Sequence, residues 1–275
     1  MSKVHILTLT WNGCDKLTKL KESLMPALEG IEYTWWIKDN ASIDNTVEVA
    51  SQWGDSVKVI EFKNNLQNFS QGCNFLFNEA KPKDDDLILL LNNDVSFGDT
   101  TSLKRMIQII KNDALVGVVG ARLLFTGTNN LQHAGVTFKP KYDLPMHFRS
   151  GEESDDNAEK NRLFQVVTGA VLLLRADSFK NAFENKSGNK GMDENYHWAF
   201  DDVDLCLSVG VNQKKKIVYC GQTKIFHEES ASLKKNPANK LFMNHNITYF
   251  KNKWRDKYKM DLDIYTKNLK HNLYK

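Results

Sequence analysis

Long apolar runs, paired cysteines and a leader-like N-terminus are all missing from this 275-residue sequence. No apolar stretch approaches the roughly 20 residues that a membrane-spanning helix requires, and the first residues lack the basic and apolar regions of a signal peptide. We therefore expect a cytoplasmic protein. The four cysteines are widely separated, which argues against a zinc site or a redox-active Cys-x-x-Cys motif. We expect them to be reduced.

The overall composition is typical of a soluble globular protein, with 41% hydrophobic and 26% charged residues. The length suits one large α/β domain or two small ones. The net charge of +3 is unevenly distributed, because residues 231–275 hold eleven lysine and arginine residues against three acidic ones. Nucleic acid, an anionic membrane surface or a phosphorylated acceptor would each suit this basic tail, and so would a solvated lysine-rich helix end.

The strongest local signal is a run of five large aliphatic residues, 87–91, followed by Asn92, Asn93 and Asp94. A short run of this kind is typical of a strand that is buried on both faces. Ligands of open α/β sheets bind outside the carboxyl ends of such strands. Asn and Asp are also common turn residues, so this pattern alone leaves a simple turn open.

Three earlier segments repeat the pattern of a strand that ends in Asn or Asp. They are residues 4–10, 33–38 and 57–62, and predicted helices follow each of them. Successive strand–helix units predict a parallel sheet with right-handed crossovers. Further along the chain we expect a helix at 102–110, a strand from 116, an irregular or hairpin-like segment at 122–148, a mobile acidic loop at 149–161, and a buried strand at 164–175 interrupted by Gly169.

In their order and spacing these motifs resemble the family 2 glycosyltransferases with a GT-A fold, especially the rhamnosyltransferase-like branch. The resemblance covers nearly everything from Val4 to Trp254. The segments that carry it are Thr10-Trp11-Asn12, Asp39-Asn40-Ala41-Ser42, Asn65-Leu66, Phe69 to Asn74, Leu91 to Asp94, Thr168-Gly169-Ala170, Asp193-Glu194, Asp201 to Leu205, and His227.

This resemblance implies a single domain with a Rossmann-like, mostly parallel sheet flanked by helices and a mixed C-terminal half. The nucleotide-binding half would comprise residues 1–120, and the acceptor-binding and catalytic half residues 121–230. Residues 231–275 would form a basic helical tail.

The resemblance also implies a pocket for a nucleotide-sugar donor. It assigns Thr10, Asp39 and Ser42 to the base and ribose, and a carboxylate at Asp39 could accept a hydrogen bond from the ring N–H of uracil or thymine. We therefore expect a UDP- or dTDP-linked sugar. The other residues expected along this cleft are Asn12, Asn65, Gly72, Asn74 and Asn93. The pair Gln67-Asn68 departs from the family pattern, which has a glycine here.

A divalent cation, Mn²⁺ or Mg²⁺, is implied by the same resemblance. It would neutralise the charge that develops on the diphosphate leaving group. The expected ligands are Asp94 and His227, with Asn92 at the first position of an Asp-x-Asp-like motif. An amide oxygen can coordinate a metal but brings no charge.

Inverting transfer needs a carboxylate that removes the proton of the acceptor hydroxyl, and the resemblance assigns this role to Asp202. The acids at 201, 202 and 204 would also be favoured at a helix start by its dipole, and the two roles are compatible. The resulting hypothesis is a metal-dependent, inverting enzyme of polysaccharide biosynthesis that moves a hexosyl or deoxyhexosyl group to a glycan or glycoconjugate. The alternatives are an enzyme that glycosylates modified nucleic acid and an inactive nucleotide-sugar-binding module.

Overall fold

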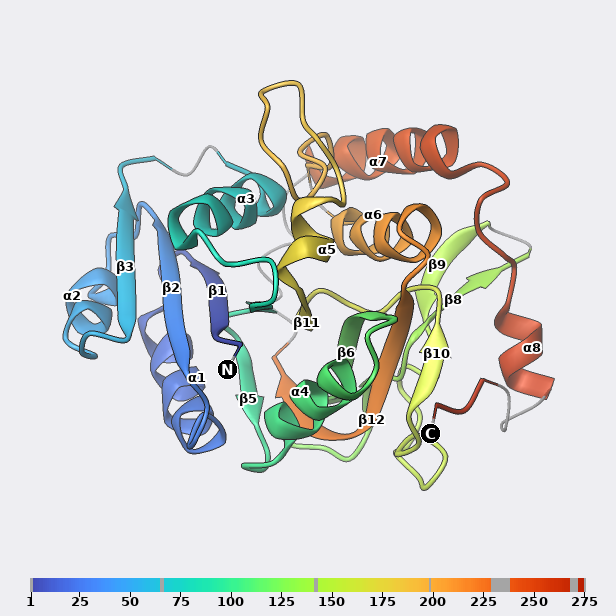
Figure 1. Cartoon of the computed structure of the whole chain (residues 1–275), viewed down its shortest axis with the longest axis horizontal. Coiled ribbons are helices and arrows are strands. Elements are labelled where there is room, and N and C mark those ends of the chain that lie inside the picture. The colour runs from blue at the N-terminus through green and yellow to red at the C-terminus, as the bar shows by residue number, and fades with distance from the viewer. Residues whose placement is uncertain are drawn as a thin grey trace.

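A ten-stranded sheet with the strand order β10-β12-β6-β11-β4-β1-β2-β3 runs through the centre of the protein, and β5 and β7 pair with β12 and β6. Helices cover both of its faces (Figure 1). The structure is a computed structural model in which residues 2–64, 67–140, 143–197, 199–228, 238–267 and 272–274 are described. No helix within those ranges is long and apolar enough to cross a membrane.

The N-terminal half confirms the predicted succession of strand–helix units. Strand β1 pairs in parallel with β2 and β4, and β2 pairs in parallel with β3. The bounds in chain order are β1 Val4–Thr10, α1 Cys14–Ala27, β2 Tyr33–Asn40, α2 Thr46–Ser51, β3 Val57–Phe62, α3 Phe69–Ala80 and β4 Leu87–Leu91.

The C-terminal half is mixed, as expected, because β11 runs antiparallel to both β4 and β6 whereas β12 runs parallel to β6. Its elements are β5 Val95–Phe97, α4 Ser102–Asn112, β6 Val116–Phe125, β7 Leu131–His133, β8 Val136–Lys139, β9 Leu144–His147, β10 Arg162–Phe164, β11 Val171–Arg175, α5 Ala176–Lys180, α6 Asp201–Leu207, β12 Lys216–His227, α7 Ala238–Trp254 and α8 Leu262–Lys267. Strands β8 and β9 form the predicted hairpin as a separate two-stranded sheet.

Alternating strand residues bury against opposite helical layers. Ile6 and Leu89 belong to the hydrophobic cluster that contains the apolar faces of α1 and α4. Their neighbours Leu7 and Leu90 belong to the cluster that contains residues of α3, α6 and α7. All five residues of β4 are buried, which explains why this strand carries no polar side chain until Asn92.

The single strand predicted at 164–175 is wrong, since the structure divides this segment into two strands in different parts of the sheet. Strand β10 lies at one edge, and β11 lies between β6 and β4. The chain between them must cross β12 and β6. Gly120 allows the crossing chain to pass close to β6, because a Cβ at this glycine would lie only 2.4 Å from the Cβ of Val167.

Ion pairs anchor the acidic loop 149–161, for which we expected mobility. The Arg149 guanidinium donates to Glu152 and Asp155 at 2.7 Å, and Arg122 donates to Glu159 at 2.8 Å. The hydrogen bond from Arg149 lowers the pKa of Asp155 to about 2. The loop is thereby tied both to itself and to β6.

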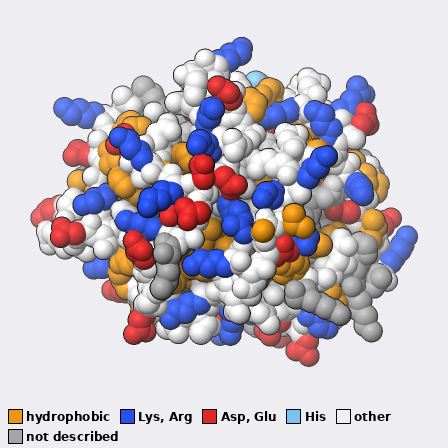
Figure 2. Space-filling view, in the orientation of Figure 1, with side chains coloured by type: hydrophobic (Ala, Val, Ile, Leu, Met, Phe, Trp, Pro, Cys, Tyr) orange, Lys and Arg blue, Asp and Glu red, His pale blue; other side chains and the backbone are white. Residues whose placement is uncertain are grey.

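The basic C-terminal segment packs onto the domain through α7, whose residues Phe250 and Trp254 are buried. The Lys253 ammonium lies 2.6 Å from the carboxylate of Asp193 and 2.8 Å from that of Asp204. The Trp254 indole N–H also donates to Asp204, at 2.6 Å. Part of the positive charge in this segment therefore compensates acids inside the protein. On the face shown in Figure 2, basic and acidic side chains are interspersed.

We predict that Lys253→Met destabilises the protein by about 3 to 5 kcal/mol at neutral pH, because it leaves two buried carboxylates without their cation. Urea unfolding measures the change, with Lys259→Met as the control because the side chain of Lys259 is exposed. A loss below about 1 kcal/mol would show that Asp193 and Asp204 do not depend on Lys253.

Candidate active site

The predicted metal ligands Asp94 and His227 meet at the carboxyl end of β4. Strand β5 follows Asp94 directly and pairs antiparallel with β12, so that His227 lies opposite Val95. This register brings the His227 Nε2 within 3.1 Å of Asp94 Oδ1. The Asn92 amide nitrogen lies 3.5 Å from the same ring nitrogen. The structure thus brings all three expected ligands together.

A glutamine that sequence reasoning missed fixes the orientation of the imidazole. Nδ1 of His227 lies 2.6 Å from Oε1 of Gln132. Because an amide oxygen can only accept, Nδ1–H donates to it, and in the neutral imidazole the lone pair is then on Nε2, the nitrogen that faces Asp94. A lone pair and a carboxylate at this separation repel each other unless a proton or a cation stands between them. Gln132 lies in the stretch predicted to be irregular or hairpin-like, where no pattern identified it.

These residues fit a divalent cation. The side chains of Asp94 and His227 are only 9% and 15% exposed, and carboxylate oxygen and imidazole nitrogen are both ligands that Mn²⁺ accepts. Within the described ranges no three His, Cys, Asp or Glu side chains gather as a metal cage. The remaining ligands would therefore come from Asn92, water or a bound diphosphate. Lys16, a second residue that the sequence did not single out, places its ammonium 3.9 Å from Asp94.

The expected donor residues at the ends of β1, β2 and β4 also converge. The Asn93 side-chain amide donates to the Thr10 hydroxyl at 3.0 Å. The backbone N–H of Asn12 donates to the Ser42 hydroxyl at 2.7 Å. Next to them a cavity of about 470 Å³ opens between the start of α1 and the turn at Asp44.

Asp39 is completely buried beneath Ser42. The backbone N–H of Ser42 donates to Asp39 Oδ2 at 2.8 Å, and the Ser42 hydroxyl donates to Oδ1. The carboxylate therefore orders the turn at 39–42. A nucleobase could reach it only if this turn shifted.

Gly72 and Asn74 have packing roles in this structure. A Cβ at Gly72 would lie 2.6 Å from the Leu9 side chain, so the glycine allows α3 to approach β1. The buried Asn74 amide donates to the Met192 carbonyl at 2.9 Å and accepts from the Met192 N–H at 2.7 Å. The departure at Asn68 is accommodated as a helix cap, because its side chain accepts from the Gln71 N–H at 2.8 Å. The predicted donor residue Asn65 lies outside the described residues.

The predicted base Asp202 sits at the start of α6 and is held by the loop before β11. The Gly169 N–H donates to Asp202 Oδ2 at 2.8 Å. A Cβ at Gly169 would lie 2.9 Å from the Cβ of Asp202, which explains the glycine. The next residue, Ala170, accepts a hydrogen bond from the Asn92 N–H at 2.9 Å. One short stretch of backbone therefore connects the carboxylate at 202 to the cluster around Asp94.

Asp201 and Asp202 form the acidic wall of a pocket of about 400 Å³, which we call the inner pocket. Its other walls are mostly apolar and come from the β8–β9 hairpin, the start of α6 and helix α7. The residues are Val136, Leu144, Pro145, Met146, His147, Ala199, Phe200, Val203, Met243 and Ile247. A hydroxyl compound that enters this pocket meets a carboxylate at one end and apolar surface elsewhere.

The two neighbouring acids differ in their environment. Burial, reinforced by the negative charge of Asp202, raises the pKa of Asp201 to about 7. Asp201 therefore keeps its proton to a higher pH than an ordinary aspartic acid does. Oδ2 of Asp202 is held in place by the Gly169 N–H. Asp204 points the other way, toward Lys253 and Trp254, and belongs to the packing of α7.

With this geometry in place, a comparison with family models gives the class of the protein. The model described as Glycosyl transferase family 2 matches residues 6–183, and the chain belongs to that family. Its α/β architecture, a mixed and mostly parallel sheet flanked by helices, is the GT-A fold. A search among curated proteins finds no match.

Solved structures show the same fold. "GalNAc-T7 with UDP, GalNAc and Mn²⁺" superposes with a TM-score of 0.67 at 12% identity and covers 98% of this chain, which spans 51% of that protein. The mannosyltransferase PcManGT from Pyrobaculum calidifontis, in complex with GDP-Man and Mn²⁺, gives 0.62 at 11% identity, with coverage of 95% and 69%. TarS from S. aureus, residues 1–349, gives 0.56 at 13% identity, with coverage of 96% and 77%. This chain therefore spans about half the length of the first of these proteins.

The raised pKa of Asp201 predicts how stability depends on pH. Since the folded pKa lies above the usual value of 3.8, the folded state holds its proton more tightly than the unfolded chain, and this stabilising effect is lost as pH rises toward 7. Asp201→Asn should therefore gain stability relative to the wild type between pH 4 and pH 7, with a constant difference above pH 8. Urea unfolding at pH 5 and pH 8 measures it. An equal difference at both values would contradict the raised pKa.

Proposed function

We propose that this chain is a metal-dependent, inverting glycosyltransferase that transfers a hexosyl or deoxyhexosyl group from a UDP- or dTDP-linked donor to a hydroxyl of a glycan. The observation that carries the proposal is the link between the two halves of the site: the Asn92–Ala170 hydrogen bond joins the Asp94–His227 cluster to the loop that holds Asp202. The two neighbours with UDP and Mn²⁺ and with GDP-Man and Mn²⁺ support a nucleotide-sugar donor and a divalent cation.

In this mechanism the donor diphosphate lies at the Asp94 end of the site and the acceptor lies in the inner pocket. Asp94, His227 and the Asn92 amide would hold a Mn²⁺ or Mg²⁺ ion, which would supply positive charge to neutralise the diphosphate. Gln132 keeps the His227 lone pair directed toward Asp94. The Lys16 ammonium adds a second positive charge beside that carboxylate.

Asp202 acts on the acceptor. As the acceptor oxygen forms its bond to the anomeric carbon, the bond from that carbon to the diphosphate oxygen breaks and the hydroxyl proton passes to the Asp202 carboxylate. The Gly169 N–H holds Oδ2 in place during this step. Attack from the side opposite the leaving group inverts the anomeric carbon, and the nucleoside diphosphate departs.

The inactive binding module is the weaker alternative, because Asp94, His227 and Asp202 are all present and connected. Transfer to modified nucleic acid rests on the basic tail. The ammonium of Lys253 in that segment is already paired with Asp193 and Asp204, so a glycan acceptor is the better proposal.

We expect excess chelator to abolish release of nucleoside diphosphate from a panel of UDP- and dTDP-sugars. Asp94→Ala should weaken binding of UDP roughly tenfold or more in the presence of Mn²⁺ and leave it unchanged without the metal, because the variant loses a charged ligand. Titration calorimetry measures both affinities, with Asp55→Ala as an exposed control. Undiminished activity in excess chelator would rule out this metal site.

Asp202→Asn should reduce transfer by roughly 10²–10⁴, the range for loss of a general base, while UDP affinity stays within a few-fold. The amide keeps the size of the side chain but accepts no proton. The exposed Asp55→Asn is the matched control; Asp204→Asn is unsuitable because Asp204 is buried beneath Lys253 and Trp254. Normal turnover in Asp202→Asn together with loss in Asp201→Asn would assign the base to Asp201 instead.

A further inference from the structure

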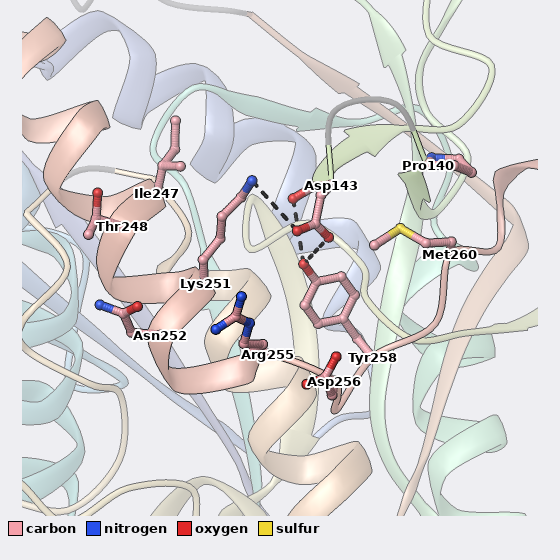
Figure 3. Close-up of a pocket in the computed structure, with 10 residues that line it drawn as sticks. All are labelled: Pro140, Asp143, Ile247, Thr248, Lys251, Asn252, Arg255, Asp256, Tyr258 and Met260. Atoms are coloured by element: carbon pink, nitrogen blue, oxygen red, sulfur yellow. Dashed lines mark hydrogen bonds and ion pairs between the residues drawn. The ribbon is translucent and has the colours of Figure 1, made fainter.

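A third cavity, of about 800 Å³, is larger than the inner pocket and lies beyond it along helix α7. We call it the outer pocket. Figure 3 shows its residues, which come from helix α7, from the segment after that helix, and from Pro140 and Asp143 in the β8–β9 connection. Ile247 lines both pockets. The two cavities are therefore neighbours along one groove.

One face of a single helix forms a wall of both cavities. Met243 and Ile247 line the inner pocket, whereas Ile247, Lys251 and Arg255 line the outer one. Residues four apart share a helix face. Arg255 is the first residue after α7 and continues its last turn, because its N–H donates to the Lys251 carbonyl at 3.0 Å; the twelve steps from Met243 to Arg255, at a rise of 1.5 Å each, cover about 18 Å. The opposite wall of both cavities comes from the β8–β9 hairpin and its connection. A groove of this length exceeds a single sugar ring.

The groove is fixed relative to the predicted base. Asn246 in α7 donates to the Ala199 carbonyl at 3.0 Å, two residues before α6. At the far end of the helix, Lys253 pairs with Asp204 in α6, close to Asp202 in sequence. These contacts hold α7 against the helix that carries the carboxylates, so the spacing between base and outer pocket is built into the fold.

The polar groups of the outer pocket indicate the kind of ligand. Lys251 and Tyr258 converge on Asp143, with Lys251 at 3.6 Å and the Tyr258 hydroxyl in a hydrogen bond (Figure 3). The side chains of Asn252 and Arg255 have no hydrogen bond or ion pair within the described part of the chain. They are left as donors facing the cavity.

The charges of the pocket cancel. Lys251 and Arg255 are balanced by Asp143 and Asp256, so an anionic ligand would meet two carboxylates and a cationic ligand two cations. Hydroxyl groups both donate and accept, and they can bond to either sign. Ile247 and Met260 add apolar surface, against which the C–H face of a sugar ring can pack.

We propose that the outer pocket is a subsite for a second, uncharged sugar unit of the acceptor, which makes the acceptor an oligosaccharide. This inference rests on the proposed function, since it takes the inner pocket as the place where the acceptor hydroxyl meets Asp202. It assigns the enzyme to the extension of an existing glycan. An earlier glycosyl transfer must then supply the acceptor.

Binding without turnover gives the first test. The full chain is labelled with ¹⁵N-arginine, and the NMR signal of the Arg255 Nε–H group is identified because it is missing in Arg255→Ala. Neutral hexasaccharides built on glucose, N-acetylglucosamine, mannose or galactose are then added separately at millimolar concentration. We expect at least one to shift this signal, and the matching monosaccharide to shift it at least tenfold less. The inference is wrong if no neutral hexasaccharide shifts it, or if only a polygalacturonate hexamer does.

Turnover gives the second test. In the wild type, kcat/KM should be about tenfold higher for a trisaccharide acceptor than for the matching monosaccharide. The double variant Asn252→Ala/Arg255→Ala should lose this gain, whereas its kcat/KM for the monosaccharide should not change. The control is Lys104→Ala, which removes an exposed charge on α4. An equal gain in the double variant would overturn the subsite. If Arg255 responds to an oligosaccharide but no donor is ever transferred, the proposed function fails and the subsite stands.

Discussion

The pairing of β4 on both sides is the constraint on which the site depends. The parallel neighbour β1 brings Thr10 to the same sheet edge as Asn93, whereas the antiparallel neighbour β11 begins where β4 ends. Without that reversal, Gly169 would lie at the opposite edge from Asp94. A purely parallel sheet could bind a nucleotide at this edge, but it could not deliver a loop that holds Asp202 from the other side. The change in strand direction thus places the loop that holds Asp202 beside the Asp94–His227 cluster.

The local periodicity of the sequence predicted the N-terminal elements because the central strands β1 and β4 are buried on both faces and helices α1 and α3 each bury an apolar face. The edge strand β3 is less buried, and its exposed residues are the polar ones. The predicted ligands Asp94 and His227 could be named from the resemblance to the family, and the structure brings these two side chains together. The path of residues 164–175 could not be predicted, since whether a chain crosses its neighbours depends on a contact such as Val167 over Gly120, which is distant in sequence. Gln132 could not be predicted for a similar reason, since its partner His227 is 95 residues away in the sequence.

The three acidic residues of the short helix α6 differ in their surroundings. Asp201 and Asp202 line a pocket, where burial raises the pKa of Asp201. Asp204, two residues further on, is enclosed by Lys253, Trp254 and the Tyr196 hydroxyl and supports the packing of α7. The sequence pattern presents three equivalent carboxylates at a helix start. Only the tertiary contacts distinguish those that can meet a substrate from the one that holds the fold together.

Helix α7 lies beyond residue 183, where the match to the family model ends, yet it forms one wall of both cavities. The family match therefore includes the β8–β9 hairpin of the inner pocket but leaves out the helix on the other side. A chain assigned to this family by residues 6–183 can thus carry a different helix along both cavities without any change in the match.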